Sequence, residues 1–276
     1  MSQQDVTRVQ TPGVYGKLPC FGDFVVRRLP GEFTEIWDAW LQRGMAGLRD
    51  RLGGRWLEFY RVAPVWRFLL TPGIAGNTGW AGVLTPSVDR VGRYFPLTIA
   101  APVSPSMDPP ATLVGLAGWF DRIEPLARHA LTVSLDFEHW DLQLRSVGGA
   151  PWIGVEDCLE QTIPLPRSRV PLLRVFLPTG SSADLQVDLW RASLSMVSDP
   201  ACLWSTYDEG EGEICLVTQG LPGAEAFGSL IDLSWEPRGW VRKRLGYGRP
   251  PSPEPAPPAP GDANGASHGD SPSNVL

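Results

Sequence analysis

The sequence predicts an α/β protein of the α+β type, a single domain whose mainly antiparallel central sheet is flanked by helices. Apolar runs at 65–71, 79–85 and 95–103 are typical of strands, and turn-rich segments separate them. Strands joined by such short connections pair antiparallel, because a parallel pair needs a long crossover. Apolar residues at three- and four-residue spacing predict helices over 32–52 and 110–131, and these helices bury their apolar faces on the sheet.

The segment that precedes the central strands is predicted to form two short strands and two helices. Residues 13–18 and 23–28 are strand-like and flank a turn that contains proline and glycine. The long helix after them ends at Gly53-Gly54, and a short helix over 56–62 ends before Pro64. The apolar face of the long helix consists of Phe33, Ile36, Trp37, Trp40, Leu41, Leu48 and Leu52.

The segment after the central strands predicts a helix and then an ambiguous stretch. Asp108 is a suitable N-cap and Pro109 a suitable first helical residue, so a helix begins at about 110. Pro125 is expected to end or kink this helix. Residues 134–147 alternate apolar and polar side chains, which favours a strand.

The C-terminal third predicts a helix, a hairpin and a short helix. Residues 184–194 fit both periods, and the length of the run favours a helix. Residues 201–207 and 213–219 flank a Glu/Gly-rich turn, as in a β-hairpin. A short helix follows Pro222, and Trp235 is expected to close the folded part.

The organisation of the chain follows from its composition. Residues 1–12 are polar and predict a flexible N-terminus, and residues 13–246 predict one globular domain. Residues 247–276 are rich in proline and almost lack large apolar residues, so they cannot bury enough surface to offset chain entropy. This tail is predicted to be disordered.

Charge and cysteine content exclude several classes of function. The net charge of −6 argues against a general nucleic-acid or anionic-membrane binder. No run reaches the roughly 20 apolar residues of a membrane span, and the N-terminus lacks a hydrophobic signal region. The four cysteines form no CxxC pair, as expected of reduced thiols. A cytoplasmic location without membrane insertion is therefore predicted.

Searches for catalytic and cofactor motifs find no match. His129, His139 and His268 belong to no HExxH motif, and the chain has no GxSxG elbow. Residues 73–79, GIAGNTG, lack the lysine and hydroxyl residue of a phosphate-binding loop. We therefore expect no metal, no cofactor and no catalytic residue, although a triad assembled in space remains open.

Two polar clusters remain as candidate sites. The first is KLPCFGDFV (17–25), where Gly22 and Asp23 directly precede an apolar strand. The second is PSVDRVGRYFP (86–96), in which Gly92 permits unusual backbone angles. This turn holds Ser87, Asp89, Arg90 and Arg93. Two arginines and a carboxylate can form a self-satisfied ion-pair network, a binding surface, or a site for an anion such as phosphate.

These clusters carry a resemblance to a known family. The segments GKLPCFGDFV, WDAWLQRGM, APVWRFLLTPGI, WAGVLTPSVDRVGRYFPLTIAAP, CLWSTY and GLPGAEAFGSLID resemble the TagF (ImpM) family of type VI secretion-associated proteins. The similarity covers residues 13–235, and 80–102 is its most specific part. The resemblance implies a cytoplasmic, non-enzymatic, post-translational repressor of type VI secretion, a contractile injection apparatus of Gram-negative bacteria.

The resemblance also implies a partner, the forkhead-associated scaffold protein Fha, and supplies no catalytic residue. The candidates for contact with that partner are Gly22, Asp23, Ser87, Asp89, Arg90, Arg93 and Tyr94. Trp80 is a further aromatic expected to be exposed near them. Two alternatives stay open: an enzyme or binding module for an anionic ligand at Asp89, Arg90 and Arg93, or a turn that only supports the fold.

Overall fold

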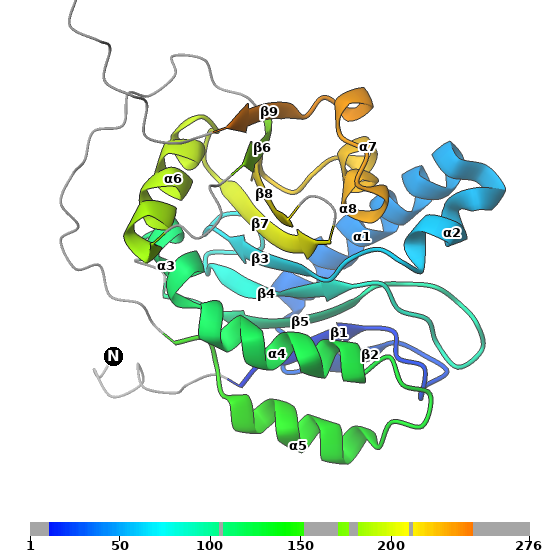
Figure 1. Ribbon diagram of the computed structural model, residues 1–276. Helices are drawn as coiled ribbons and strands as arrows, with labels where there is room; N and C mark the ends of the chain where they lie inside the picture. Colours follow the sequence, from blue (N-terminus) through cyan, green and yellow to red (C-terminus); the bar gives the residue numbers. More distant parts are fainter. Residues whose placement is uncertain (1–10, 105–106, 152–170, 177–181, 210–211, 245–276) are drawn as a thin grey trace, which may run out of the picture. The chain divides into compact units, whose positions relative to one another are not determined.

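The computed structural model describes residues 11–104, 107–151, 171–176, 182–209 and 212–244. Within them one mixed sheet has the strand order β2-β1-β5-β4-β3-β7-β8-β6-β9 (Figure 1). The strands are β1 (Gly13–Gly16), β2 (Val25–Arg27), β3 (Trp66–Leu70), β4 (Trp80–Thr85), β5 (Leu97–Pro102), β6 (Leu172–Phe176), β7 (Ala201–Asp208), β8 (Gly212–Gln219) and β9 (Val241–Arg244).

The pairing of the strands is antiparallel except between β6 and β9. Strands β3, β4 and β5 form the predicted meander, and β7 and β8 form the predicted hairpin. The α+β class with a mainly antiparallel sheet is therefore confirmed.

Helices cover both faces of this sheet. They are α1 (Gly31–Leu52), α2 (Trp56–Tyr60), α3 (Pro109–Gly115), α4 (Ala117–His129), α5 (Phe137–Val147), α6 (Ala183–Ser195), α7 (Ala224–Phe227) and α8 (Ser229–Asp232). In Figure 1, α4 crosses in front of the sheet and α1 lies behind it. Two hydrophobic cores result, because successive strand residues point to opposite faces.

The core beneath α1 is built from aromatic rings. Trp37 packs against Phe68 of β3 with 4.9 Å between the ring centroids, and Trp40 lies 5.6 Å from Trp204 of β7. Tilted and edge-on rings at these distances stabilise a core beyond the area they bury. The indole N–H of Trp37 donates to Thr98 Oγ1 at 2.8 Å, so this buried donor is satisfied. Most of the predicted apolar face of the long helix is thus the face that the sheet covers, but the prediction for Ile36 is wrong, because Ile36 points to solvent.

The opposite core lies under α4 and α5, and two sequence-based expectations fail there. The helix does not end at Pro125, because Pro125 lies inside α4, and the chain breaks instead at Leu116, between α3 and α4. Gly115, which ends α3, has low helical propensity. The break lets α3 pack on α6 while α4 packs on β4.

The strand predicted over 134–147 is wrong as well. The Asp136 side chain accepts from the backbone N–H of His139 and so caps the N-terminus of α5. Phe137, Trp140 and Leu144 are buried and share one helical face. Their three- and four-residue spacing coincides in part with a two-residue alternation, which explains the error.

Trp235 does not close the folded part, which continues through β9 and so stays inside the predicted range of residues 13–246. Strand β9 pairs in parallel with β6 at the edge of the sheet. Trp240 is buried and packs edge-on against Trp235. The intervening turn is held by the Arg238–Asp232 ion pair at 2.5 Å. The predictions for residues 1–10 and for the tail fall outside the described residues.

Gly44 allows a close approach between α1 and α7. A Cβ atom at this position would lie 2.4 Å from Cγ of Phe227. We predict that Gly44→Ala lowers the free energy of unfolding by about 1–3 kcal/mol despite the better helix propensity of alanine, because of overpacking. Urea unfolding followed by circular dichroism measures this change.

Gly118, in the first turn of α4, is the matched control. It is exposed, and a Cβ there would meet nothing within 4 Å. We expect Gly118→Ala to stabilise the protein by up to about 1 kcal/mol. Equal effects at the two glycines would contradict this account of the α1–α7 contact.

Candidate functional site

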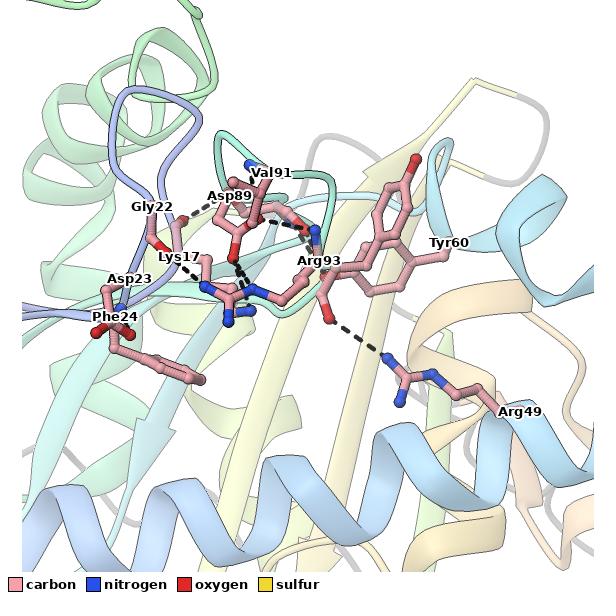
Figure 2. Close-up of polar contacts among 11 residues, drawn as sticks. Lys17, Gly22, Asp23, Phe24, Arg49, Tyr60, Asp89, Val91 and Arg93 are labelled. Atoms are coloured by element: carbon pink, nitrogen blue, oxygen red, sulfur yellow. Dashed lines mark hydrogen bonds and ion pairs between the residues drawn. The ribbon is translucent and has the colours of Figure 1, made fainter.

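The two polar clusters meet around one buried carboxylate, that of Asp89. Its Oδ2 atom accepts from Lys17 Nζ at 2.9 Å and from Arg93 Nε at 2.6 Å (Figure 2). The Asp89 side chain is fully buried and Lys17 nearly so, whereas the Arg93 side chain is 56% exposed. Lys17 and Asp89 are 72 residues apart in the chain, so their ion pair joins the start of the loop after β1 to the turn between β4 and β5.

The backbone of this turn encloses the second carboxylate oxygen. Asp89 Oδ1 accepts from the N–H groups of Val91 at 3.0 Å and Arg93 at 2.8 Å. The N–H of Asp89 donates to the carbonyl of Arg93 at 3.0 Å. Gly92 has φ +88°, which confirms the unusual backbone expected at this glycine. The carboxylate therefore holds both the turn and its neighbours in place.

The loop after β1 is attached to the turn by three hydrogen bonds. The N–H of Arg90 donates to the carbonyl of Phe21 at 2.8 Å, and the Arg93 guanidinium donates to the carbonyl of Gly22 (Figure 2). Ser87 Oγ donates to the carbonyl of Lys17 at 2.7 Å. The two motifs that stand out in the sequence are thus one structural unit.

The pKa of Asp89 reflects these contacts. Burial by itself raises the pKa of this carboxyl. The N–H and guanidinium of Arg93 and the ammonium of Lys17 outweigh burial and hold the pKa well below its ordinary value. Asp89 is therefore ionised at neutral pH, with donors on both oxygens, and is unsuited to act as a general base.

The predicted site residues divide into an inner and an outer group. Ser87 and Asp89 are buried and point into the unit. Asp23 and Arg90 are exposed, Gly22 and Tyr94 are partly buried, and the Asp23 carboxylate accepts from the N–H of Phe24. The expectation that Trp80 is exposed is wrong: it is 5% exposed, because β4 directs it against Phe33 of α1.

Sequence reasoning missed two contributors from α2 and its end. The Tyr60 hydroxyl donates to the carbonyl of Ser87 and accepts from the N–H of Ser87, both at 3.1 Å. Burial raises the pKa of Tyr60 well above its ordinary value, so the hydroxyl stays protonated. Arg61 donates to the hydroxyl of Tyr94 at 2.6 Å. No motif marks these two residues, which reach the turn only through the fold.

A small pocket lies beside the turn. Its volume is about 140 Å³, and its lining is mostly apolar. The lining includes Pro19, Tyr60, Pro86, Val88, Tyr94 and Leu131, with Arg61 at the same pocket. These residues come from four separate segments of the chain.

Metal sites and membrane spans are not found in the described part of the chain. No three His, Cys, Asp or Glu side chains there are grouped to hold a metal ion. None of the described helices is both long and apolar enough to cross a membrane.

Comparison with known proteins identifies the class. Residues 13–147 match the family described as TagF N-terminal domain, type VI secretion system-associated. The crystal structure of PA0076 from Pseudomonas aeruginosa PAO1 is 33% identical and superposes with a TM-score of 0.65. The match covers 82% of this chain and 96% of that one. No curated protein matches the sequence.

The two matches therefore place this fold among type VI secretion-associated proteins. The chain belongs to the TagF N-terminal domain family. Asp89 and its partners lie within the residues that the family covers.

The buried ion pair predicts a large effect of neutralising Asp89. Asp89→Asn leaves the ammonium of Lys17 buried without a counter-charge, and we expect a loss of about 3–5 kcal/mol in the free energy of unfolding at pH 7. Asp23→Asn is the control, because Asp23 is exposed and bonds only the next N–H; its expected change is within about 0.5 kcal/mol. Urea unfolding of both variants measures the difference.

The depressed pKa of Asp89 predicts acid sensitivity. A carboxyl with a lower pKa in the folded state stabilises the fold above the unfolded-state pKa, and this contribution is lost as the pH falls towards the folded-state pKa. The loss begins near about pH 4 and grows below it. The urea concentration at the unfolding midpoint of the wild type, measured from pH 6 to pH 2, should decrease below about pH 4. A midpoint that is flat below pH 4 would exclude this coupling.

Proposed function

We propose that this protein is a cytoplasmic, non-enzymatic, post-translational repressor of type VI secretion. In this proposal it binds and sequesters the forkhead-associated scaffold protein Fha. One observation carries the proposal: both oxygens of the Asp89 carboxylate are occupied by hydrogen bonds within the protein. Four such bonds come from Lys17, Arg93 and the turn backbone. The most prominent charged cluster thus shapes a surface and offers no reactive group. Family membership supplies the association with type VI secretion.

The alternative, an enzyme or binding module for an anionic ligand, has less support. The anion clamp expected at this turn uses Arg90 and Arg93 together, but Arg93 is held by Asp89 and by the carbonyl of Gly22, so Arg90 would have to act without it. The neighbouring pocket of about 140 Å³ is smaller than the roughly 300–1,000 Å³ typical of small-molecule sites. Its mostly apolar lining also favours a protein side chain over a charged metabolite.

The proposed contact surface is the outer group of the turn. Asp23, Arg90, Arg93 and Tyr94 are the side chains available to a partner, and Gly22 offers backbone beside them. Arginine and aromatic residues are frequent anchors of protein interfaces. Ser87 and Asp89, in this proposal, act through the shape of the turn.

Binding between the purified full-length chain and Fha from the same organism tests the proposal. Isothermal titration calorimetry should detect a complex with wild type, and Arg90→Ala/Arg93→Ala should weaken it by about 1–3 kcal/mol, because interface arginines often contribute this much. Gly118→Ala, on exposed α4, is the folded control and should bind as wild type does.

Two outcomes would count against the proposal in different ways. Absence of any complex with wild-type protein would overturn sequestration of Fha. Full-strength binding by a folded Arg90→Ala/Arg93→Ala variant would preserve the role and remove the turn from the interface. Circular dichroism of each variant separates loss of binding from loss of fold.

A further inference from the structure

Three arginines around the turn have no acidic partner in the part of the chain that the structure describes. Arg49, Arg61 and Arg90 are all exposed. Arg49 donates to the carbonyl of Tyr94 at 3.4 Å, and Arg61 donates to the Tyr94 hydroxyl, so both lie at the same tyrosine (Figure 2 shows Arg49 pointing towards the turn). None of the three forms an ion pair with a described carboxylate.

The charges inside the unit balance apart from Arg90. Lys17 and Arg93 contribute two positive charges and Asp23 and Asp89 two negative charges, so the local positive charge comes from Arg49, Arg61 and Arg90. The whole chain, by contrast, carries a net charge of −6. A local basic region on an acidic protein attracts and orients acidic partners.

The apolar pocket lies within this basic region. Tyr60 and Tyr94 line it together with Pro19, Pro86 and Val88, and Arg61 belongs to its lining. The two tyrosine rings meet edge-on at 5.8 Å, and Trp56 packs edge-on against Tyr94 at 5.7 Å, so the aromatic wall is held rigidly. A rigid aromatic wall receives an apolar side chain with little loss of conformational freedom.

Exposed valines gather in the segments that form the pocket. Val62 is 78%, Val91 65% and Val133 77% exposed. Val62 follows Arg61, Val91 lies between Val88 and Tyr94, and Val133 is two residues beyond Leu131, each of these neighbours being a lining residue. These side chains are therefore exposed next to lining residues in the chain, and the peptide experiment tests whether a partner contacts them.

We propose that this surface, the pocket with Arg61 in its lining, Arg90 on the adjoining turn and the three valines next to lining residues in the chain, binds an acidic protein segment that packs one apolar side chain into the pocket against Tyr94. The proposal deepens the proposed function, since it rests on a protein partner and states the chemistry of the segment that is recognised. It also moves the centre of the contact from the signature turn to residues of α2 and of the chain after α4, which no motif marks.

The chemistry of the surface favours this occupant over two others. A free phosphate would use the arginines but gain nothing from the apolar lining or the valines. A second copy of this chain would bring the same positive region against itself, and like charges repel. An acidic segment with an apolar anchor satisfies both features at once.

Nuclear magnetic resonance with defined peptides tests the chemistry without reference to Fha. We expect the acetylated peptide EELPEE to shift the amide signals of Val62, Val88, Val91 and Val133 in the full-length labelled chain in a saturable way. Peptide EESPEE, which lacks the apolar anchor, should bind at least about fivefold more weakly, and KKLPKK should cause no shift. Shifts elsewhere, equal binding of EESPEE and EELPEE, or the same shifts with inorganic phosphate alone would overturn the proposal.

Charge reversal at Arg61 and Arg90 tests the same surface with matched variants. Arg61→Glu/Arg90→Glu should weaken EELPEE binding at least about tenfold, and the exposed Val133→Asp should weaken it without touching the Tyr94 contacts. Arg122→Glu is the control, because Arg122 is exposed on α4 and bonds only the Gly118 carbonyl of its own helix at 3.4 Å. Equal losses in Arg122→Glu would reduce the effect to net charge and overturn the site.

Titration of Fha with these variants separates the two proposals. Peptide binding at the pocket without any Fha complex would keep this surface and overturn sequestration of Fha. An Fha complex that is unaffected by Arg61→Glu/Arg90→Glu and Val133→Asp would keep sequestration and overturn this surface. Light scattering of the free chain should give a monomer mass; a dimer dissolved by Arg61→Glu/Arg90→Glu would assign the surface to a second copy and overturn the proposal.

Discussion

The hydrogen bonds to the buried carboxylate of Asp89 are the constraint on which the surface of this protein depends. A buried ion pair is favourable only when further donors satisfy the charged atoms, because desolvation costs several kcal/mol per ion. Lys17 supplies the counter-charge from the start of the loop after β1, and the turn supplies two N–H groups. The charged residues that stand out in the sequence are therefore mostly occupied in fixing geometry. Around this geometry lie the ring of Tyr94 and the exposed side chains of Arg61, Arg90 and Arg93.

The sheet explains why that surface can be rigid. A hydrophobic core packs on each face of the sheet. The core under α1 is aromatic, and the core under α4 and α5 is aliphatic and aromatic. The turn between β4 and β5 emerges from central strands that are covered on both faces, and α2 closes on it through Tyr60. A turn anchored in this way loses little entropy on binding, which favours recognition of a partner.

Periodicity and turn chemistry predicted most of the fold. The meander, the hairpin and the long helix are correct, because each is encoded locally by apolar spacing and by Gly or Pro at its ends. The errors arise where local patterns are ambiguous, as in α5, or where pairing is distant, as for β9. At the site, the sequence drew attention to Ser87 and Asp89 but could not show that Tyr60 bonds the backbone of Ser87 and that Lys17 pairs with Asp89. Such partners are brought together only by tertiary structure.

The two edge strands of the sheet bear on the tendency of the protein to aggregate. An open sheet edge presents unpaired N–H and C=O groups that can recruit another chain. Here one edge is β2, only three residues long, and the other is β9, which carries exposed Arg242 and Lys243. A short strand offers few bonds to an added neighbour, and like charges repel a second copy. Both features oppose the addition of a further strand to the extended sheet.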